Sequence, residues 1–144
     1  MKVRLKKLDI VFSRLVRERN NYICQACCEN KRHDAGTYDC AHIMGRRGVA
    51  LRWHPANAVG LCRKCHMFFT EHPFDWADWC RDNFGEERVA ELRLVSNKPV
   101  KWPKSLREEI FQHYKAELLT MELKRLDTQK VIDFKPHECM HTFK

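Results

Sequence analysis

The stretch from Cys24 to His72 decides the fold. It begins with Cys24-Gln25-Ala26-Cys27 and, after a long insertion, continues with Cys62-Arg63-Lys64-Cys65-His66. Two cysteines three residues apart can turn both sulfurs toward one ion, and two such pairs make the closed tetrahedral site of structural Zn²⁺. Residues 28–61 separate the pairs, a longer span than the roughly 15–20 residues of simple four-cysteine zinc modules. We therefore expect these four cysteines to bind one structural zinc ion, and a folded segment to fill the insertion.

The composition indicates a single basic domain. The chain has 144 residues, which suits one domain, and a formal net charge of +8. Because small, strongly basic proteins most commonly bind phosphate backbones, we expect DNA as the partner. No apolar run approaches the roughly 20 residues that cross a bilayer, so we expect no membrane association.

The other cysteines indicate a reducing compartment. The chain opens without a secretory signal pattern, so we expect a soluble, cytoplasmic protein with reduced cysteines. Four cysteines remain outside the zinc pairs, and their uneven scatter suits thiols better than disulfide bridges: Cys28, Cys40, Cys80 and Cys139.

The insertion and the residues after it are expected to form two short strands and a helix. Residues 37–43 and 58–61 favour strands, because they are short runs suited to a pleated surface and bounded by turn residues. A helix should run from Cys62 to Pro73, which ends or restarts it. Such a ββα unit buries little surface, so zinc binding must supply much of its folding free energy. The expected fold is α+β, with a small zinc-stabilised ββα-metal core and flanking α-helices.

Four segments are expected within a single domain spanning residues 1–144. Residues 1–20 should form a basic N-terminal helix capped by Asp9, and residues 21–72 the zinc-bound core. Residues 73–97 are acidic and aromatic-rich and should form a helical scaffold. Residues 98–144 should form a C-terminal helix and tail.

The C-terminal helix should be capped by Ser105 and carry one apolar stripe. The stripe is Leu106, Ile110, Tyr114, Leu118 and Met121. It can pack on its own domain, which we favour, or on a second copy to give a homodimer. The tail carries His137, Cys139 and His141, which could bind metal, although we expect a frayed terminus.

Three side chains of the core can carry chemistry. His42, at a strand end, can take a proton from water as a general base. Asn57 cannot ionise, but its hydrogen bonds can hold the imidazole or the loop in one orientation. His66 follows a zinc ligand at a helix start and is a natural ligand for a second, catalytic divalent metal. Loop arginines can grip the flanking phosphates: Arg46, Arg47 and Arg52.

In this order the motifs resemble the HNH endonucleases, the ββα-metal nucleases. The resemblance covers roughly residues 20–75, and is carried by the cysteine pairs with Asp39-Cys40-Ala41-His42-Ile43, Asn57 and Leu61-Cys62-Arg63-Lys64-Cys65-His66. The string Arg46-Arg47, Arg52-Trp53 and Phe68-Phe69-Thr70-Glu71-His72-Pro73 further resembles phage-encoded HNH proteins, including the NinG/Rap recombination nucleases.

The resemblance implies metal-dependent hydrolysis of DNA phosphodiesters, in recombination or processing in the host cytoplasm. It implies His42 as the base, Asn57 as the central asparagine, and His66 as a ligand of Mg²⁺, Mn²⁺ or Ni²⁺.

The chain departs from the HNH pattern at Ala41. Many HNH nucleases place an acidic residue or histidine there, immediately before the base, to hold the catalytic metal. Asp39 lies on the same strand face, about 6–7 Å farther back, and could reach the metal directly or through water. Cys40, on the face of His42, is the less favoured alternative, and His72 is either a further ligand or a helix C-terminal residue. Because small zinc modules often only bind nucleic acid, the alternative function is a non-catalytic zinc-stabilised DNA-binding module.

Overall fold

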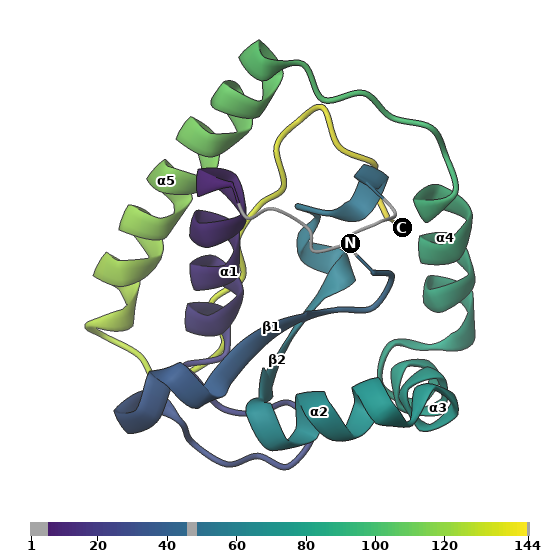
Figure 1. The fold of residues 1–144 in the computed structure, drawn as a ribbon. Helices are drawn as coiled ribbons and strands as arrows, with labels where there is room; N and C mark the ends of the chain where they lie inside the picture. The colour runs from purple at the N-terminus through teal and green to yellow at the C-terminus, as the bar shows by residue number, and fades with distance from the viewer. Residues whose placement is uncertain (1–5, 46–48, 144) are drawn as a thin grey trace.

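The computed structural model describes residues 6–45 and 49–143, which form five α-helices around a two-stranded antiparallel sheet (Figure 1). The elements are α1 (Lys7–Arg19), β1 (Tyr38–His42), β2 (Ala58–Cys62), α2 (Arg63–Glu71), α3 (Pro73–Phe84), α4 (Glu86–Ser96) and α5 (Lys104–Arg125). Short 3₁₀ turns occupy Arg32–Thr37, Val49–Leu51 and Pro55–Asn57. The expected α+β class is confirmed, as a mostly helical chain with a β-hairpin and a four-cysteine cluster between strands and helices.

The two strands agree with the predicted ones to within a residue at each end. They pair antiparallel, with Tyr38 opposite Cys62 at one end and His42 opposite Ala58 at the other. Gly60 lies under the ring of Tyr38, because a Cβ at this glycine would lie 1.9 Å from the tyrosine hydroxyl. That hydroxyl donates a hydrogen bond of 2.8 Å to the carbonyl of Ile23. The hairpin is thereby attached to the segment that carries the first cysteine pair.

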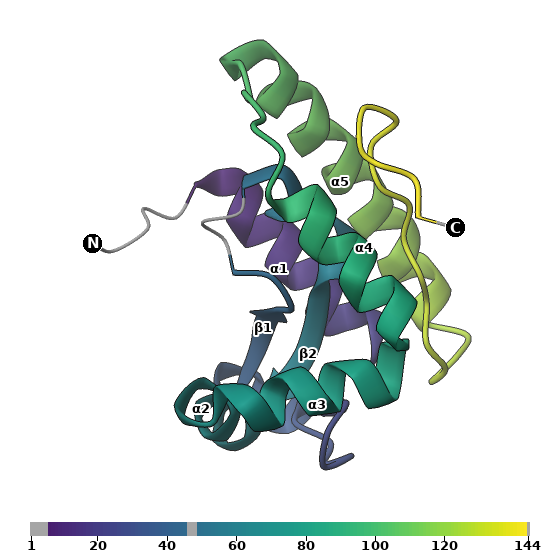
Figure 2. The ribbon, with the colours of Figure 1, turned by 90° about the vertical axis from the view of Figure 1, so that its right-hand side faces the viewer.

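Two hydrophobic clusters lie on either side of the hairpin (Figures 1 and 2). The first joins α1 to α5 and includes Phe12, Trp53 and Tyr114. The second joins the hairpin to α2, α3 and α4 and includes Leu61 and Leu92. The predicted scaffold helices therefore build one wall of the core.

The apolar stripe of α5 packs within its own chain, as we favoured. Ile110, Tyr114, Leu118 and Met121 are buried in the same cluster as the apolar face of α1. The stripe is therefore covered by α1 within the chain, and a homodimer through the C-terminal helix stays a prediction.

The predicted N-caps of two helices are wrong, by three residues for α1 and by two for α5. α1 begins at Lys7, and Asp9 lies in its first turn, where its carboxylate accepts a 2.7 Å hydrogen bond from the backbone N–H of Lys6. α5 begins at Lys104 with Pro103 as its N-cap, ahead of the predicted Ser105. Asp9 and Ser105 have a strong preference for the N-cap position, but both lie inside their helices. The N-cap positions are occupied by Lys6 and Pro103, which have no such preference.

The C-terminal tail is docked, which corrects the prediction of a frayed terminus. Ile132, Phe134 and Met140 are buried against α1 and α5, and the backbone N–H of Ile132 donates to the carbonyl of Arg19 at 2.9 Å. Nε2 of His141 lies 3.0 Å from the carboxylate of Glu91 on α4. Apolar burial therefore fixes this segment, although it has no regular secondary structure.

Candidate metal centre and active site

The four predicted zinc ligands come together. The ligand sulfurs of Cys24, Cys27, Cys62 and Cys65 all lie within 4.8 Å of one another. A tetrahedron with Zn–S bonds of about 2.3 Å has sulfurs about 3.8 Å apart, and the Cys27 and Cys62 sulfurs are 3.8 Å apart. The cluster is therefore consistent with a structural Zn²⁺. Within residues 6–45 and 49–143 no other group of three or more metal-binding side chains meets the same distance limit.

Backbone geometry builds the first half of this cage. After Cys27 the chain reverses at Cys28, whose φ of 64° lies in the left-handed region, and the Cys28 N–H donates to the Cys24 carbonyl at 2.9 Å. The second half lies at the end of β2 and the start of α2, where Cys62 is the N-cap and Cys65 lies in the first turn.

Gln25 aligns the two halves. Its backbone N–H donates to the Gly60 carbonyl at 3.0 Å, and its side-chain oxygen accepts from the Gly60 N–H at 2.8 Å. Since Gly60 precedes Cys62 by two residues, this pair of bonds fixes the first cysteine pair beside the second. Sequence reasoning missed Gln25, although its place between two ligands was a signal that could have singled it out.

The thiols differ in how readily they ionise. Burial tends to raise the pKa of Cys24, but hydrogen bonds from the backbone N–H groups of Cys27, Cys62 and Ala26 outweigh it and lower the pKa to about 7. Burial, joined by hydrogen bonds among the neighbouring thiols, raises the pKa of Cys27 and of Cys65. Metal binding must therefore displace protons from the cluster, since only thiolates are good ligands.

His42 and His66 lie beside one pocket of about 310 Å³. The pocket lies between the end of β1 and α2, and its lining also includes Ala41, Phe69 and Thr70. His42 comes from the last residue of β1, and His66 from the first turn and a half of α2, directly after the zinc cluster. Both histidines that the sequence singled out therefore line this pocket.

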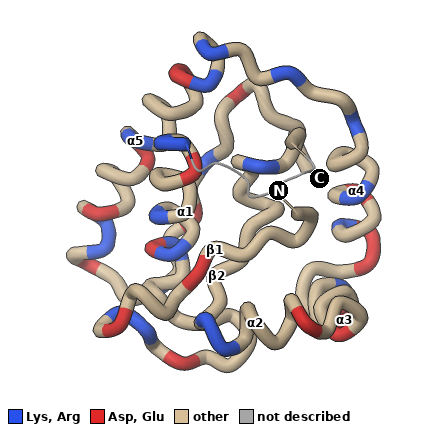
Figure 3. Tube along the Cα trace, in the orientation of Figure 1, with Lys and Arg blue, Asp and Glu red and all other residues tan. Residues whose placement is uncertain are grey.

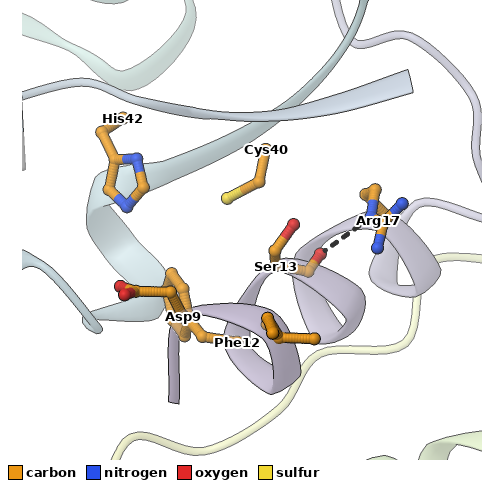
Figure 4. Close-up of a pocket in the computed structure, with 7 residues that line it drawn as sticks. Asp9, Phe12, Ser13, Arg17, Cys40 and His42 are labelled. Carbon is orange, nitrogen blue, oxygen red and sulfur yellow. Dashed lines mark hydrogen bonds between the residues drawn. The ribbon is translucent and has the colours of Figure 1, made fainter. Parts of the chain in front are cut away.

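The His42 ring is held by a main-chain contact. Its Nε2 lies 3.0 Å from the carbonyl oxygen of Arg52. Because a carbonyl can only accept, Nε2 carries the proton in this contact, and the lone pair of the neutral ring lies on Nδ1. His42 also lines a second pocket of about 190 Å³ between α1 and β1, with Asp9, Phe12, Ser13 and Cys40 (Figure 4).

Asn57 holds the loop that leads away from His42. Its side-chain oxygen accepts from the N–H of Met44 at 2.7 Å, and its amide donates to the carbonyls of Met44 at 2.8 Å and Leu51 at 3.2 Å. The residue is fully buried. Asn57 is therefore placed to orient the loop, one of the two roles suggested by its chemistry.

His66 and Asp39 face each other. Nδ1 of His66 lies 3.1 Å from one carboxylate oxygen of Asp39, and the guanidinium of Arg63 bonds to both oxygens, at 2.9 and 3.3 Å. Burial tends to raise the pKa of Asp39, but the hydrogen bonds from Arg63 and His66 outweigh it and lower the pKa. Asp39 is therefore a carboxylate at neutral pH, beside the histidine with which it was predicted to share a metal.

The three predicted phosphate-gripping arginines have different outcomes. Arg46 and Arg47 lie outside the described residues. Arg52 is 7 % exposed and makes a bidentate ion pair with Asp9, at 2.7 and 2.8 Å. Asp9 also accepts from the indole N–H of Trp53 at 2.9 Å. This burial does not fit the predicted contact of Arg52 with phosphate, and it gives Arg52 a structural role that sequence reasoning missed.

His72 behaves as a helix C-terminal residue, one of the two predicted alternatives. Its Nδ1 lies 2.8 Å from the carbonyl of Phe68, and the two rings stack at 4.2 Å.

The cysteines outside the cluster form no disulfide. Among the described residues no helix is long and apolar enough to cross a membrane.

Comparisons with known proteins do not assign this chain to a family. A scan of protein-family models, a search of curated proteins and a search of solved structures each returned no match. The fold and site define a mostly helical α+β protein with a four-cysteine cluster, consistent with structural Zn²⁺, and a pocket lined by two histidines.

Proposed function

We propose that this chain is a metal-dependent DNA endonuclease of the HNH type, which hydrolyses phosphodiester bonds. The observation that carries the proposal is the pocket shared by His42 and His66 at the junction of β1 and α2. The four-cysteine cluster supports it, because that cluster fixes the start of the helix that carries His66.

His42 acts as the general base. Its Nε2–H is directed at the Arg52 carbonyl, which fixes the tautomer, so Nδ1 is the atom that accepts a proton from the attacking water. Asn57 supports this geometry by bonding to the backbones of Met44 and Leu51, since Arg52 directly follows Leu51. Asn57 is therefore a positioning residue in the proposed mechanism.

His66 and Asp39 hold the catalytic divalent cation, for which Mg²⁺, Mn²⁺ and Ni²⁺ are the candidates. The donor set fits, because Nδ1 of His66, which lines the pocket, already lies 3.1 Å from a carboxylate oxygen of Asp39. Such a cation polarises the scissile phosphate and stabilises the departing oxyanion. Ala41 contributes no ligand, so the carboxylate comes from the residue two positions earlier on the same strand face. Arg63, paired with Asp39, keeps this carboxylate ionised and oriented.

DNA is the proposed substrate, because the net charge of +8 favours a polyanion. The proposed setting is phage DNA recombination or processing, following the resemblance described above.

The test is a nicking assay on supercoiled plasmid with the zinc-loaded protein. Cutting should require added Mg²⁺, Mn²⁺ or Ni²⁺ and should stop with EDTA. Linear, flapped and four-way DNA substrates, compared in the same assay, then define the preferred shape. DNA binding with no cutting under any of these metals would replace the nuclease with the zinc-stabilised DNA-binding module.

A further inference from the structure

Helices α1 and α5 lie side by side and run in the same direction (Figures 1 and 2). Ion pairs mark the alignment: Lys7 pairs with Glu108 at 2.5 Å near the helix starts, and Arg14 pairs with Glu122 at 2.8 Å farther along. Basic and acidic residues are intermixed along both helices (Figure 3). The two N-termini therefore lie at the same end of the molecule, where the positive ends of both helix dipoles add.

A basic pocket of about 200 Å³ lies at this shared end. Its lining is Lys6, Lys7, Leu8, Lys104, Arg107 and Glu108. Four cations thus face a single carboxylate, which is already paired with Lys7. Burial and the nearby charges of Arg107 and Arg52 lower the pKa of Lys6, which shows how closely these cations are crowded.

Stability alone does not explain this arrangement. Cations near a helix N-terminus oppose the helix dipole, and an acidic residue there would be stabilising. The first turn of α5 has no acidic residue, and its N-cap, Pro103, supplies no side-chain hydrogen bond. The N-terminal amide groups of α5 therefore lack the side-chain cap that commonly satisfies them.

One buried donor in the pocket lining also lacks a partner. Nε of Arg107 is inaccessible to solvent and has no hydrogen-bond partner among the described residues. Buried donors in folded proteins are almost always satisfied, so an orphaned one beside a pocket indicates a missing acceptor. A phosphate group provides acceptor oxygens and the opposite charge.

We propose that the pocket between the N-termini of α1 and α5 binds a backbone phosphate of DNA, through Lys104, Arg107 and Lys6. The proposal rests on the proposed function and names a second contact for its substrate. Farther along the same helix, α1 lines the smaller pocket that His42 also borders, between α1 and β1.

The test compares two charge-matched variants of α5 for DNA binding. Lys104→Gln/Arg107→Gln removes two charges from the pocket, and Lys115→Gln/Lys124→Gln removes two charges from the same helix farther from its start. Fluorescence anisotropy with a labelled duplex, without added divalent metal, gives the dissociation constant at several salt concentrations. Circular dichroism checks the fold, and the exposed Lys104→Gln alone serves if the double variant is unfolded.

The pocket variant should bind at least about tenfold more weakly than the parent at moderate salt. The slope of its log Kd against log salt concentration should be shallower by about 1 for each lost phosphate contact. The control variant should change much less. If the parent binds and cuts DNA but the two variants behave alike, the phosphate contact is wrong and the nuclease stands. If the parent neither binds nor cuts DNA, both proposals fail.

A second measurement distinguishes binding of a DNA backbone phosphate from binding of free phosphate. Inorganic phosphate is added to each variant, and the shift of the thermal midpoint is measured. Stabilisation of the parent by millimolar phosphate, with unchanged DNA affinity of the pocket variant, would mean that the pocket holds free phosphate and would overturn the proposal.

Discussion

Replacing Asn57 with alanine should destabilise the fold by about 3–4 kcal/mol. The change removes three hydrogen bonds made by a fully buried side chain, to the N–H and carbonyl of Met44 and to the carbonyl of Leu51. Each buried backbone group left without a partner costs about 1–3 kcal/mol, and the Met44 N–H and at least one carbonyl are left so. For a chain of this length such a loss lowers the thermal midpoint by about 10 °C.

Urea denaturation of the zinc-loaded proteins measures this difference. The matched control is Asn83→Ala, which removes an exposed asparagine whose amide bonds only to the Trp79 carbonyl and should cost less than about 0.5 kcal/mol. Asn57→Asp keeps the acceptor for Met44 but points a carboxylate at two carbonyls, so it should also be destabilising, and more so as the pH rises and the carboxyl ionises. A loss below about 1 kcal/mol for Asn57→Ala would refute the claim that this side chain fixes the loop.

Four further substitutions test the zinc cluster, the catalytic pair and the buried ion pair. Cys62→Ser should lower the zinc content from about one per chain and reduce thermal stability, as measured by elemental analysis and melting. His42→Ala should cut DNA at least about 100-fold more slowly while it keeps zinc and DNA affinity, and His66→Ala should shift or abolish the metal requirement; equal rates would rule out the HNH mechanism. Asp9→Asn should be destabilising at neutral pH, because it removes the carboxylate charge from a buried, bidentate ion pair with Arg52.

The same ion pair predicts how stability depends on pH. Burial tends to raise the pKa of Asp9, but hydrogen bonds from Arg52, the Lys6 backbone and Trp53 outweigh it and lower the pKa below 3.8. The stabilisation is therefore complete above that pH and is lost as the pH falls through the folded-state pKa. Urea titrations at pH 7 and pH 3 should show a smaller difference between the parent and Asp9→Asn at the lower pH.

Features encoded by local patterns were predictable from the sequence. The two cysteine pairs fixed the metal cluster, because the three-residue spacing within each pair is set by the turn that carries it. The strands were predicted to within a residue, since their β-favouring runs are bounded by turn residues. His42 and His66 could be placed at a common site because each lies next to an element boundary that the cysteines or the strand pattern had located.

Features that depend on long-range contacts were not predictable in the same way. Arg52 looked like an exposed loop arginine because its partner, Asp9, lies 43 residues away in the chain and was assigned to a helix cap. The tail looked frayed because it has no periodic pattern, whereas Ile132 and Phe134 are fixed by α1 and α5. In both cases the deciding partner is distant in the sequence.

The loop between the strands links these findings to the proposed chemistry. His42 is oriented by the Arg52 carbonyl, and the position of that carbonyl depends on two anchors on opposite sides of the loop. Asn57 fixes the loop from the β2 side, and Asp9 fixes Arg52 from α1. Neither anchor is a zinc ligand, so the cluster positions His66 while buried polar contacts position His42. The two halves of the proposed active site therefore depend on different interactions, and a variant such as Asp9→Asn should impair His42 while the zinc cluster and His66 remain intact.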